Sequence, residues 1–133
     1  RERVLIDGSP GIGCPVIASV SGADAALVVT EPTLSGLHDL GRVANLTAHF
    51  QIPTMVCVNK WDLNEEIARQ IERMAKERGL DLAGRIRYEA AFTDAQIARK
   101  PIIEYQADCE ASAEIRTVWT HVEAALSGSS VVT

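Results

Sequence analysis

The sequence has few aromatic residues: two Trp, two Tyr and two Phe make up 5% of its 133 residues. Its three cysteines, Cys14, Cys57 and Cys109, are odd in number and widely spaced. They fit neither a disulfide framework nor a zinc-binding pattern, so we expect a reducing, cytoplasmic setting. No apolar run is long enough to cross a bilayer, and no signal-peptide pattern is present.

An excess of positive charge is also lacking, because 13 Lys and Arg stand against 18 Asp and Glu, a formal net charge of −5. This balance argues against direct electrostatic binding to nucleic acid or to an anionic membrane. An apolar content of 47% with 23% charged residues is typical of a soluble globular domain. The chain opens on Arg1 without a methionine, so we expect it to be cut from a larger protein. We expect one domain over residues 1–127 and a disordered tail over residues 128–133.

Apolar runs alternate with segments of helical periodicity along the chain. The predicted strands are Val4–Ile6, Ala25–Thr30, Thr54–Val58 and a weaker one, Leu82–Tyr88, at or near an edge. The predicted helices run from Cys14 to Gly22, from Leu34 to about Phe50, from the capping residue Asn64 to Gly79, over Thr93–Lys100, and around Ile115–Leu126, with Trp119 in the core. Continuous apolar strands alternating with helices predict an α/β fold of three layers, a mostly parallel sheet flanked by helices.

Three of the predicted strands end in loops that are rich in polar residues: Asp7–Gly11, Thr30–Thr33 and Asn59–Asp62. The carboxyl ends of parallel strands meet at one edge of the sheet, where ligands bind. In the first loop, Asp7 is suited to hold Mg²⁺, and the glycines let backbone N–H groups approach phosphate oxygens. The alternative is a tight loop in which Asp7 caps a helix.

The loop Asn59–Asp62, Asn-Lys-Trp-Asp, has the chemistry of a base-reading loop. The Asp62 carboxylate only accepts hydrogen bonds, which suits the adjacent donors of guanine, whereas the Asn59 amide can pair with adenine. The stem of Lys60 can lie along a base. Trp61 either stacks on a ligand or packs on the next helix. The alternative is a purely structural loop in which Asn59 binds backbone groups and Asp62 caps that helix.

Together these segments resemble MinD/ParA-like P-loop ATPases. The resemblance rests on Val4–Val20 with its Asp-Gly-Ser-Pro-Gly-Ile-Gly-Cys-Pro-Val, on Thr30–Gly36, on Asn59–Asn64, and on Ala91–Thr93 and Lys100–Tyr105. The subgroup that it resembles most is that of the MinD superfamily ATPases with an inserted ferredoxin-like domain, relatives of Mrp and the nitrogenase iron protein. The resemblance implies ATP and Mg²⁺ as cofactors of the full-length protein, a homodimer, and [4Fe-4S] clusters in the inserted domain.

The resemblance also implies roles for individual residues. Asp7 resembles the Walker B acid, which acts on Mg²⁺ through water, and Gly11 resembles the switch glycine that senses the γ-phosphate. Asn59 resembles the residue that contacts adenine, and Asp62 stands where guanine-specific relatives read their base. Arg87 stands where relatives have a proline that borders the base.

The chain departs from this family in two ways. No Gly-Lys-Ser or Gly-Lys-Thr, and hence no P-loop, occurs in it, and it lacks the ferredoxin cysteine clusters. We therefore expect the C-terminal half of such an ATPase, a partial P-loop NTPase fold without the P-loop strand, and no ATP hydrolysis by this chain alone.

In the family the P-loop strand lies between the two strands that Val4–Ile6 and Ala26–Thr30 resemble. We expect these two to pair directly or another chain to fill the gap. Two alternatives stay open: part of a related GTPase, suggested by Asp62, and a non-catalytic α/β interaction domain.

Overall fold

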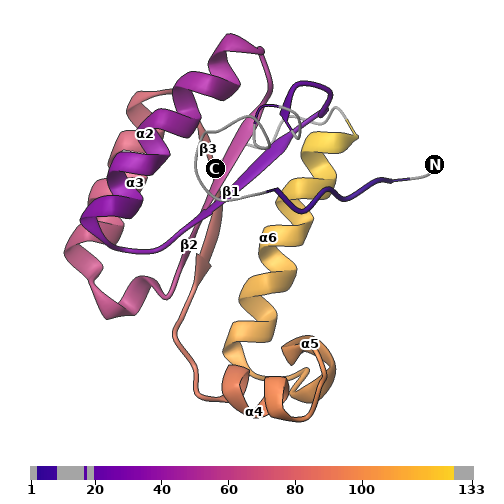
Figure 1. Cartoon of the computed structure of the whole chain (residues 1–133). Coiled ribbons are helices and arrows are strands. Elements are labelled where there is room, and N and C mark those ends of the chain that lie inside the picture. The colour runs from indigo at the N-terminus through magenta and orange to yellow at the C-terminus, as the bar shows by residue number, and fades with distance from the viewer. Residues whose placement is uncertain (1–2, 9–16, 18–19, 128–133) are drawn as a thin grey trace.

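The computed structural model describes residues 3–8, 17 and 20–127 of the chain. At its centre lies a three-stranded parallel sheet in the order β1-β2-β3, formed by Ala26–Thr30, Thr54–Asn59 and Asp81–Ile86. Parallel neighbours need a crossover connection, and a helix lies between each consecutive pair of strands in the chain. The predicted α/β class with a parallel sheet is confirmed (Figure 1).

Helices cover both faces of this sheet. Helices α2 and α3 lie on one face and α6 lies on the other (Figure 1). Their bounds, with those of the shorter helices, are α2 Leu34–His49, the 3₁₀ helix η1 Trp61–Leu63, α3 Glu65–Glu77, α4 Ala91–Ile97, α5 Ile102–Tyr105 and α6 Glu110–Leu126. Within residues 20–127, no helix is long and apolar enough to cross a membrane.

The central strand β2 carries the core, because its side chains point alternately into the two helical layers. Val56 and Val58 pack against Leu40 of α2 and Ile71 of α3, all fully buried. On the other face, Met55 and Cys57 pack against residues of α6, including Val118 and Val122. Burial raises the pKa of the Cys57 thiol to about 12, so this side chain stays neutral and behaves as a small apolar group.

The sequence correctly predicted where α3 begins and ends, because both ends carry local signals. The Asn64 side chain accepts a hydrogen bond of 3.1 Å from the backbone N–H of Ile67, as an N-cap should. Glu65 and Glu66 stand in the first turn, where negative charge favours the helix dipole. At the other end, Gly79 has a φ of +73°, a conformation that glycine adopts without steric cost.

The predicted strand Val4–Ile6 is wrong. Residues 3–8 have no regular secondary structure, and the Val4, Leu5 and Ile6 side chains are 84%, 87% and 56% exposed. The expected direct pairing with Ala26–Thr30 is therefore also wrong, and β1 lies at the edge of the sheet within the described residues. Three apolar residues in a row can form a strand only when a neighbouring strand accepts their backbone hydrogen bonds.

Smaller differences concern the second half of the chain. β3 begins and ends earlier than expected, and α4 begins two residues before the predicted Thr93. The short helix α5 was not predicted. Trp119, expected in the core, is 43% exposed. In the predicted helix Cys14–Gly22, Ile17 and Val20 are helical and a turn follows at Gly22. Residues 14–16 and 18–19 of that prediction lie outside the described residues, as does the predicted tail at 128–133.

The Asn64 cap gives a direct test of local stability. We expect Asn64→Ala to lower the free energy of unfolding by about 1 kcal/mol, because the N–H of Ile67 loses its acceptor. Asn64→Asp keeps an acceptor at the cap and should stay within about 0.5 kcal/mol of the unchanged chain. Urea denaturation followed by circular dichroism measures both, and equal losses for the two variants would contradict the assigned cap.

Candidate functional site

The loops that follow the strands lie along one edge of the sheet. Since β1, β2 and β3 are mutually parallel, their carboxyl ends point the same way. The residues that follow them are Glu31, Lys60 and Arg87. The predicted convergence of polar loops therefore holds for the loops after β1 and β2, and the loop after β3 joins them.

An ion pair connects the first two loops. The ammonium nitrogen of Lys60 lies 3.3 Å from a carboxylate oxygen of Glu31. Lys60 has a φ of +56°, a left-handed conformation that turns the chain sharply out of β2 and into η1. The Lys60 and Glu31 side chains are 40% and 54% exposed, so solvent screens the pair and it contributes little to stability. Its consequence is geometric: the loop after β1 is held beside the loop after β2.

Asp62 connects the second loop to the third. Its Oδ1 atom accepts a hydrogen bond of 2.7 Å from the backbone N–H of Tyr88, which follows β3. The alternative in which Asp62 caps the next helix is not what the structure shows, because Asn64 holds that position. The Asp62 carboxylate was considered as a reader of guanine. One of its two oxygens instead binds the loop after β2 to the loop after β3.

Trp61 packs inward rather than outward. Its ring is half-buried against the core between β2, α2 and α3, and the guanidinium carbon of Arg85 lies 4.8 Å from the ring centroid. Glu72 of α3 accepts a hydrogen bond of 2.8 Å from Arg85 Nε. This hydrogen bond raises the pKa of Arg85 above its usual value. Of the two roles considered for Trp61, the packing role is the one that the structure supports.

The Arg87 side chain is directed to α6. Its Nε atom donates a hydrogen bond of 2.9 Å to Glu114, and its guanidinium also forms an ion pair with Glu110. The hydrogen bond to Glu114 raises the pKa of Arg87. Arg87 therefore connects the loop after β3 to α6, next to the Tyr88 amide that Asp62 binds.

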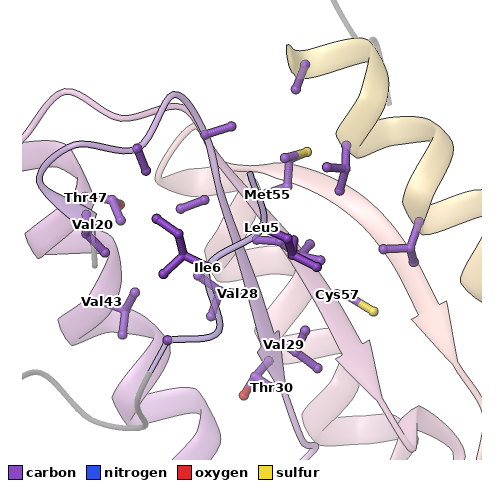
Figure 2. A pocket seen from close by; sticks show the side chains of 18 of the residues that line it. Leu5, Ile6, Val20, Val28, Val29, Thr30, Val43, Thr47, Met55 and Cys57 are labelled. Carbon is purple, nitrogen blue, oxygen red and sulfur yellow. The ribbon is translucent and has the colours of Figure 1, made fainter. Parts of the chain in front are cut away.

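Asp7 lies in the exposed segment 3–8 and lines a hollow of about 1670 Å³ beside β1. Figure 2 shows this hollow, with Leu5 and Ile6 of the same segment near β1. Glu31 and Thr33, from the end of β1, line it as well. Gly11 lies outside the described residues.

These residues allow a test of whether magnesium and a nucleotide fit the site. The described residues contain no group of three or more His, Cys, Asp or Glu side chains that could hold a metal by themselves. Mg²⁺ in nucleotide sites needs only one or two carboxylates, because phosphates and water supply its other ligands. A single exposed Asp7 beside an open hollow fits that requirement, and the half-buried Asn59 offers an amide at the end of β2.

Sequence reasoning missed the partners of these residues. The acceptor on Asp62 and the donor on Tyr88 are 26 positions apart, and Arg87 and Glu114 are 27 apart. It also missed Cys109, whose sulfur accepts a hydrogen bond from Ser112 N–H and so caps α6. Asp, Arg and Glu are common on surfaces, so residue type alone carries no signal for these pairs.

The parallel sheet flanked by helices is a P-loop NTPase-like α/β fold, and comparisons with known proteins agree. MinD from Aquifex aeolicus superposes with a TM-score of 0.69 at 25% identity, over 92% of this chain and 51% of that one. MinD from Pyrococcus horikoshii, solved with Mg-ADP, gives a TM-score of 0.74 at 14% identity, over 95% of this chain and 52% of that one. The cell division ATPase MinD of Pyrococcus furiosus gives 0.72 at 16% identity, over 88% and 49%.

Curated protein sequences also match the chain. An uncharacterized protein of Methanocaldococcus jannaschii, MJ0578, is 38% identical over 63 residues, 47% of this chain and 23% of that protein. The iron-sulfur cluster carrier protein of Pyrococcus horikoshii is 27% identical over 119 residues, 79% of this chain and 40% of that protein. No protein-family model matches the chain. The resemblance to MinD/ParA-like ATPases is thus confirmed, and the chain spans about half the length of the matched MinD chains.

The contact between Asp62 and Tyr88 can be tested by a matched pair of variants. In Asp62→Ala the Tyr88 N–H loses its acceptor, and we expect its amide to exchange with solvent at least about tenfold faster, as the loss of roughly 1.4 kcal/mol would produce. Asp62→Asn keeps an amide oxygen in place and should preserve most of the protection. Hydrogen exchange measured by NMR separates the two, and an unchanged Tyr88 amide in Asp62→Ala would rule out the assigned contact.

Proposed function

We propose that this chain is the C-terminal, nucleotide-binding portion of a MinD/ParA-like ATPase and binds ATP with Mg²⁺ only together with a P-loop segment that it lacks. The observation that carries the proposal is the edge of loops, in which Lys60–Glu31 and Asp62–Tyr88 hold three strand ends together. Support also comes from the MinD chain of Pyrococcus horikoshii, which has the same fold and was solved with Mg-ADP.

In this proposal the phosphate end of the nucleotide lies near the segment that contains Asp7 and Gly11. Asp7 holds Mg²⁺, directly or through water, and Gly11 offers its backbone N–H to the terminal phosphate. The bound metal would neutralise negative charge on the phosphates. The exposure of the Asp7 carboxylate beside the hollow supports this role.

The base end of the nucleotide lies at the loops after β2 and β3. Asn59 pairs with adenine through its amide, and the stem of Lys60 lies along the base. Asp62 shapes this site through the Tyr88 amide, and Arg87 fixes the neighbouring wall through Glu114. A GTPase would need the Asp62 carboxylate for guanine, and its engagement with Tyr88 favours adenine instead.

The whole protein is proposed to act as a homodimer, as the resemblance implies. The similarity to an iron-sulfur cluster carrier protein supports a link to iron–sulfur chemistry, with [4Fe-4S] clusters carried by an inserted domain outside this chain.

The proposal predicts different activities for the chain and for the protein that contains it. The chain alone should show no Mg²⁺-dependent ATP hydrolysis above buffer, because nothing in its sequence supplies the P-loop lysine. The parent protein, which includes the polypeptide upstream of Arg1, should bind ATP more tightly than GTP. Release of phosphate and isothermal titration measure these properties, and Mg²⁺-dependent turnover by the pure chain would overturn the assignment.

Asn59 is the residue to change in the parent protein. Asn59→Ala should weaken ATP binding by about tenfold, since a good amide–adenine pair contributes roughly 1–3 kcal/mol. Asn45, an exposed asparagine on α2, serves as the control, and Asn45→Ala should leave the affinity within about twofold. Equal affinities for the Asn59→Ala protein and the unchanged protein would remove Asn59 from the base site.

A further inference from the structure

Lys60 has the strained backbone conformation of the loop Asn59–Asp62. Within the described residues, the non-glycine residues with a positive φ are Gln51, Lys60 and Arg99. Gln51 and Arg99 each follow the C-cap of a helix, where one left-handed residue is a common way to end the helix. Lys60 follows a strand, and its φ of +56° carries a steric cost for a residue with a Cβ. Neighbouring contacts must hold such a residue in place.

Trp61, the next residue, packs against the core. The Lys60–Glu31 ion pair on one side of it is exposed, so solvent screens that contact. The Asp62–Tyr88 hydrogen bond on the other side is exposed as well. The Trp61 ring instead packs against the buried cluster between β2, α2 and α3. Because Trp61 directly follows Lys60, a fixed ring also restrains the left-handed turn.

The indole N–H of Trp61 is buried and has no hydrogen-bond acceptor among the described residues. Apolar packing is non-directional, so it keeps the ring in the core without selecting one orientation. The directional contact comes from Arg85, whose guanidinium carbon lies 4.8 Å from the ring centroid, inside the range of roughly 6 Å for cation–π attraction. Arg85 is therefore the residue that orients the ring.

Glu72 of α3 fixes Arg85 in turn. Arg85 Nε donates a hydrogen bond of 2.8 Å to one carboxylate oxygen of Glu72, and Nη2 donates to the other oxygen. A bidentate pair of this kind fixes the plane of the guanidinium as well as its position. The Glu72 side chain is 17% exposed, so the pair is partly shielded from solvent. A continuous set of contacts thus runs from α3 through β3 to the loop after β2.

We propose that Trp61, Arg85 and Glu72 are positioning residues for the loop Asn59–Asp62 and that they set its affinity for the base of a nucleotide. They act through the backbone, since the Trp61 ring packs against the core. Asn59 precedes the left-handed turn and Asp62 follows the anchored ring, so a shift of the ring moves both. The proposal rests on the proposed function for the identity of the ligand, but the effect on the loop is measured without a ligand.

Hydrogen exchange in the chain alone tests the effect on the loop. Arg85→Met removes the guanidinium and keeps an apolar stem. The Tyr88 amide, which Asp62 holds, should then exchange at least about threefold faster, because the loop opens more often.

Ile102→Val is the control for this measurement. It changes a buried residue of α5 and should lower the free energy of unfolding by a similar amount, which urea denaturation verifies. Its contacts survive opening of the loop, so Tyr88 exchange should change by less than about twofold. An unchanged Tyr88 amide in Arg85→Met, or equal acceleration in both variants, would overturn the proposal.

A double-mutant cycle shows whether Arg85 acts through the ring. Trp61→Leu removes the ring, so adding Arg85→Met to that chain should change Tyr88 exchange by less than about 1.5-fold. Trp61→Phe keeps a smaller ring under the guanidinium and should retain part of the Arg85 effect. Circular dichroism establishes that each variant is folded. The full effect of Arg85→Met in the Trp61→Leu chain would mean that Arg85 acts by another route, which contradicts the proposal.

Glu72 offers a matched pair of variants on a different element. Glu72→Ala should accelerate Tyr88 exchange about as much as Arg85→Met, because the guanidinium loses its bidentate partner. Glu72→Gln retains an acceptor oxygen and should fall between Glu72→Ala and the unchanged chain. Since Glu72 lies on α3, this effect on Tyr88 does not come from a change in β3 itself. Tyr88 exchange in Glu72→Ala equal to that in the unchanged chain would contradict the proposed role.

Ligand binding by the parent protein tests the effect on affinity. Arg85→Met should weaken binding of ATP with Mg²⁺ by at least about threefold. Binding of inorganic triphosphate with Mg²⁺ should change by less than about twofold, because this ligand has no base. Isothermal titration measures both affinities at a temperature where each variant is folded. Equal losses for the two ligands, or an unchanged affinity for ATP, would overturn the proposal.

The positioning role and the proposed function fail in different ways. If the unchanged parent protein binds no ATP, the proposed function and the ligand named here are wrong, while Tyr88 exchange still decides whether the three residues position the loop. If the parent protein binds ATP and Arg85→Met leaves that affinity unchanged, the positioning role is wrong and the nucleotide assignment stands.

Discussion

The hydrogen bonding of β2 to a parallel strand on each side is the interaction on which the rest of the structure depends. It places β2 in the middle of the sheet, where α2 and α3 cover Val56 and Val58 on one face and α6 covers Met55 and Cys57 on the other. It also fixes the direction of all three strands, which is why polar residues far apart in sequence meet at one edge. Within the part of the chain that the structure describes, β1 is hydrogen-bonded to a neighbouring strand on one side only.

Elements with local signals were predictable from the sequence. The cap at Asn64, the glycine at position 79 and the apolar run from residue 54 to residue 58 specify their structures through neighbours in the chain. Val4–Ile6 shows the limit of this reasoning. Its residues have the apolar character of a strand, but a strand exists only where another strand accepts its hydrogen bonds, and no sequence pattern reports whether that neighbour is present.

The candidate site also combines features that the local sequence predicts with features that it does not. The residue types of the loop Asn59–Asp62 indicate its chemistry, and its place after β2 follows from the apolar run. The partner of Asp62 does not follow from the sequence, because Tyr88 reaches Asp62 only through the pairing of β2 with β3. Arg87 illustrates the same difficulty, since its guanidinium is directed by Glu114 of a helix that packs on β3. Trp119 was expected in the core because of helical periodicity. Periodicity identifies the apolar face of a helix but not how much of that face its neighbours cover, and Trp119 is 43% exposed.

The two tryptophans lie in different surroundings, and this makes the chain its own optical reporter. Trp61 is sheltered behind the loop after β2, beneath Arg85, whereas Trp119 lines the hollow next to β1. A ligand at the loops would alter the emission of the sheltered indole, and any loss of solvent from the hollow would shift the emission of the exposed one toward shorter wavelengths. With one tryptophan replaced at a time by phenylalanine, fluorescence would follow the two events separately and in real time.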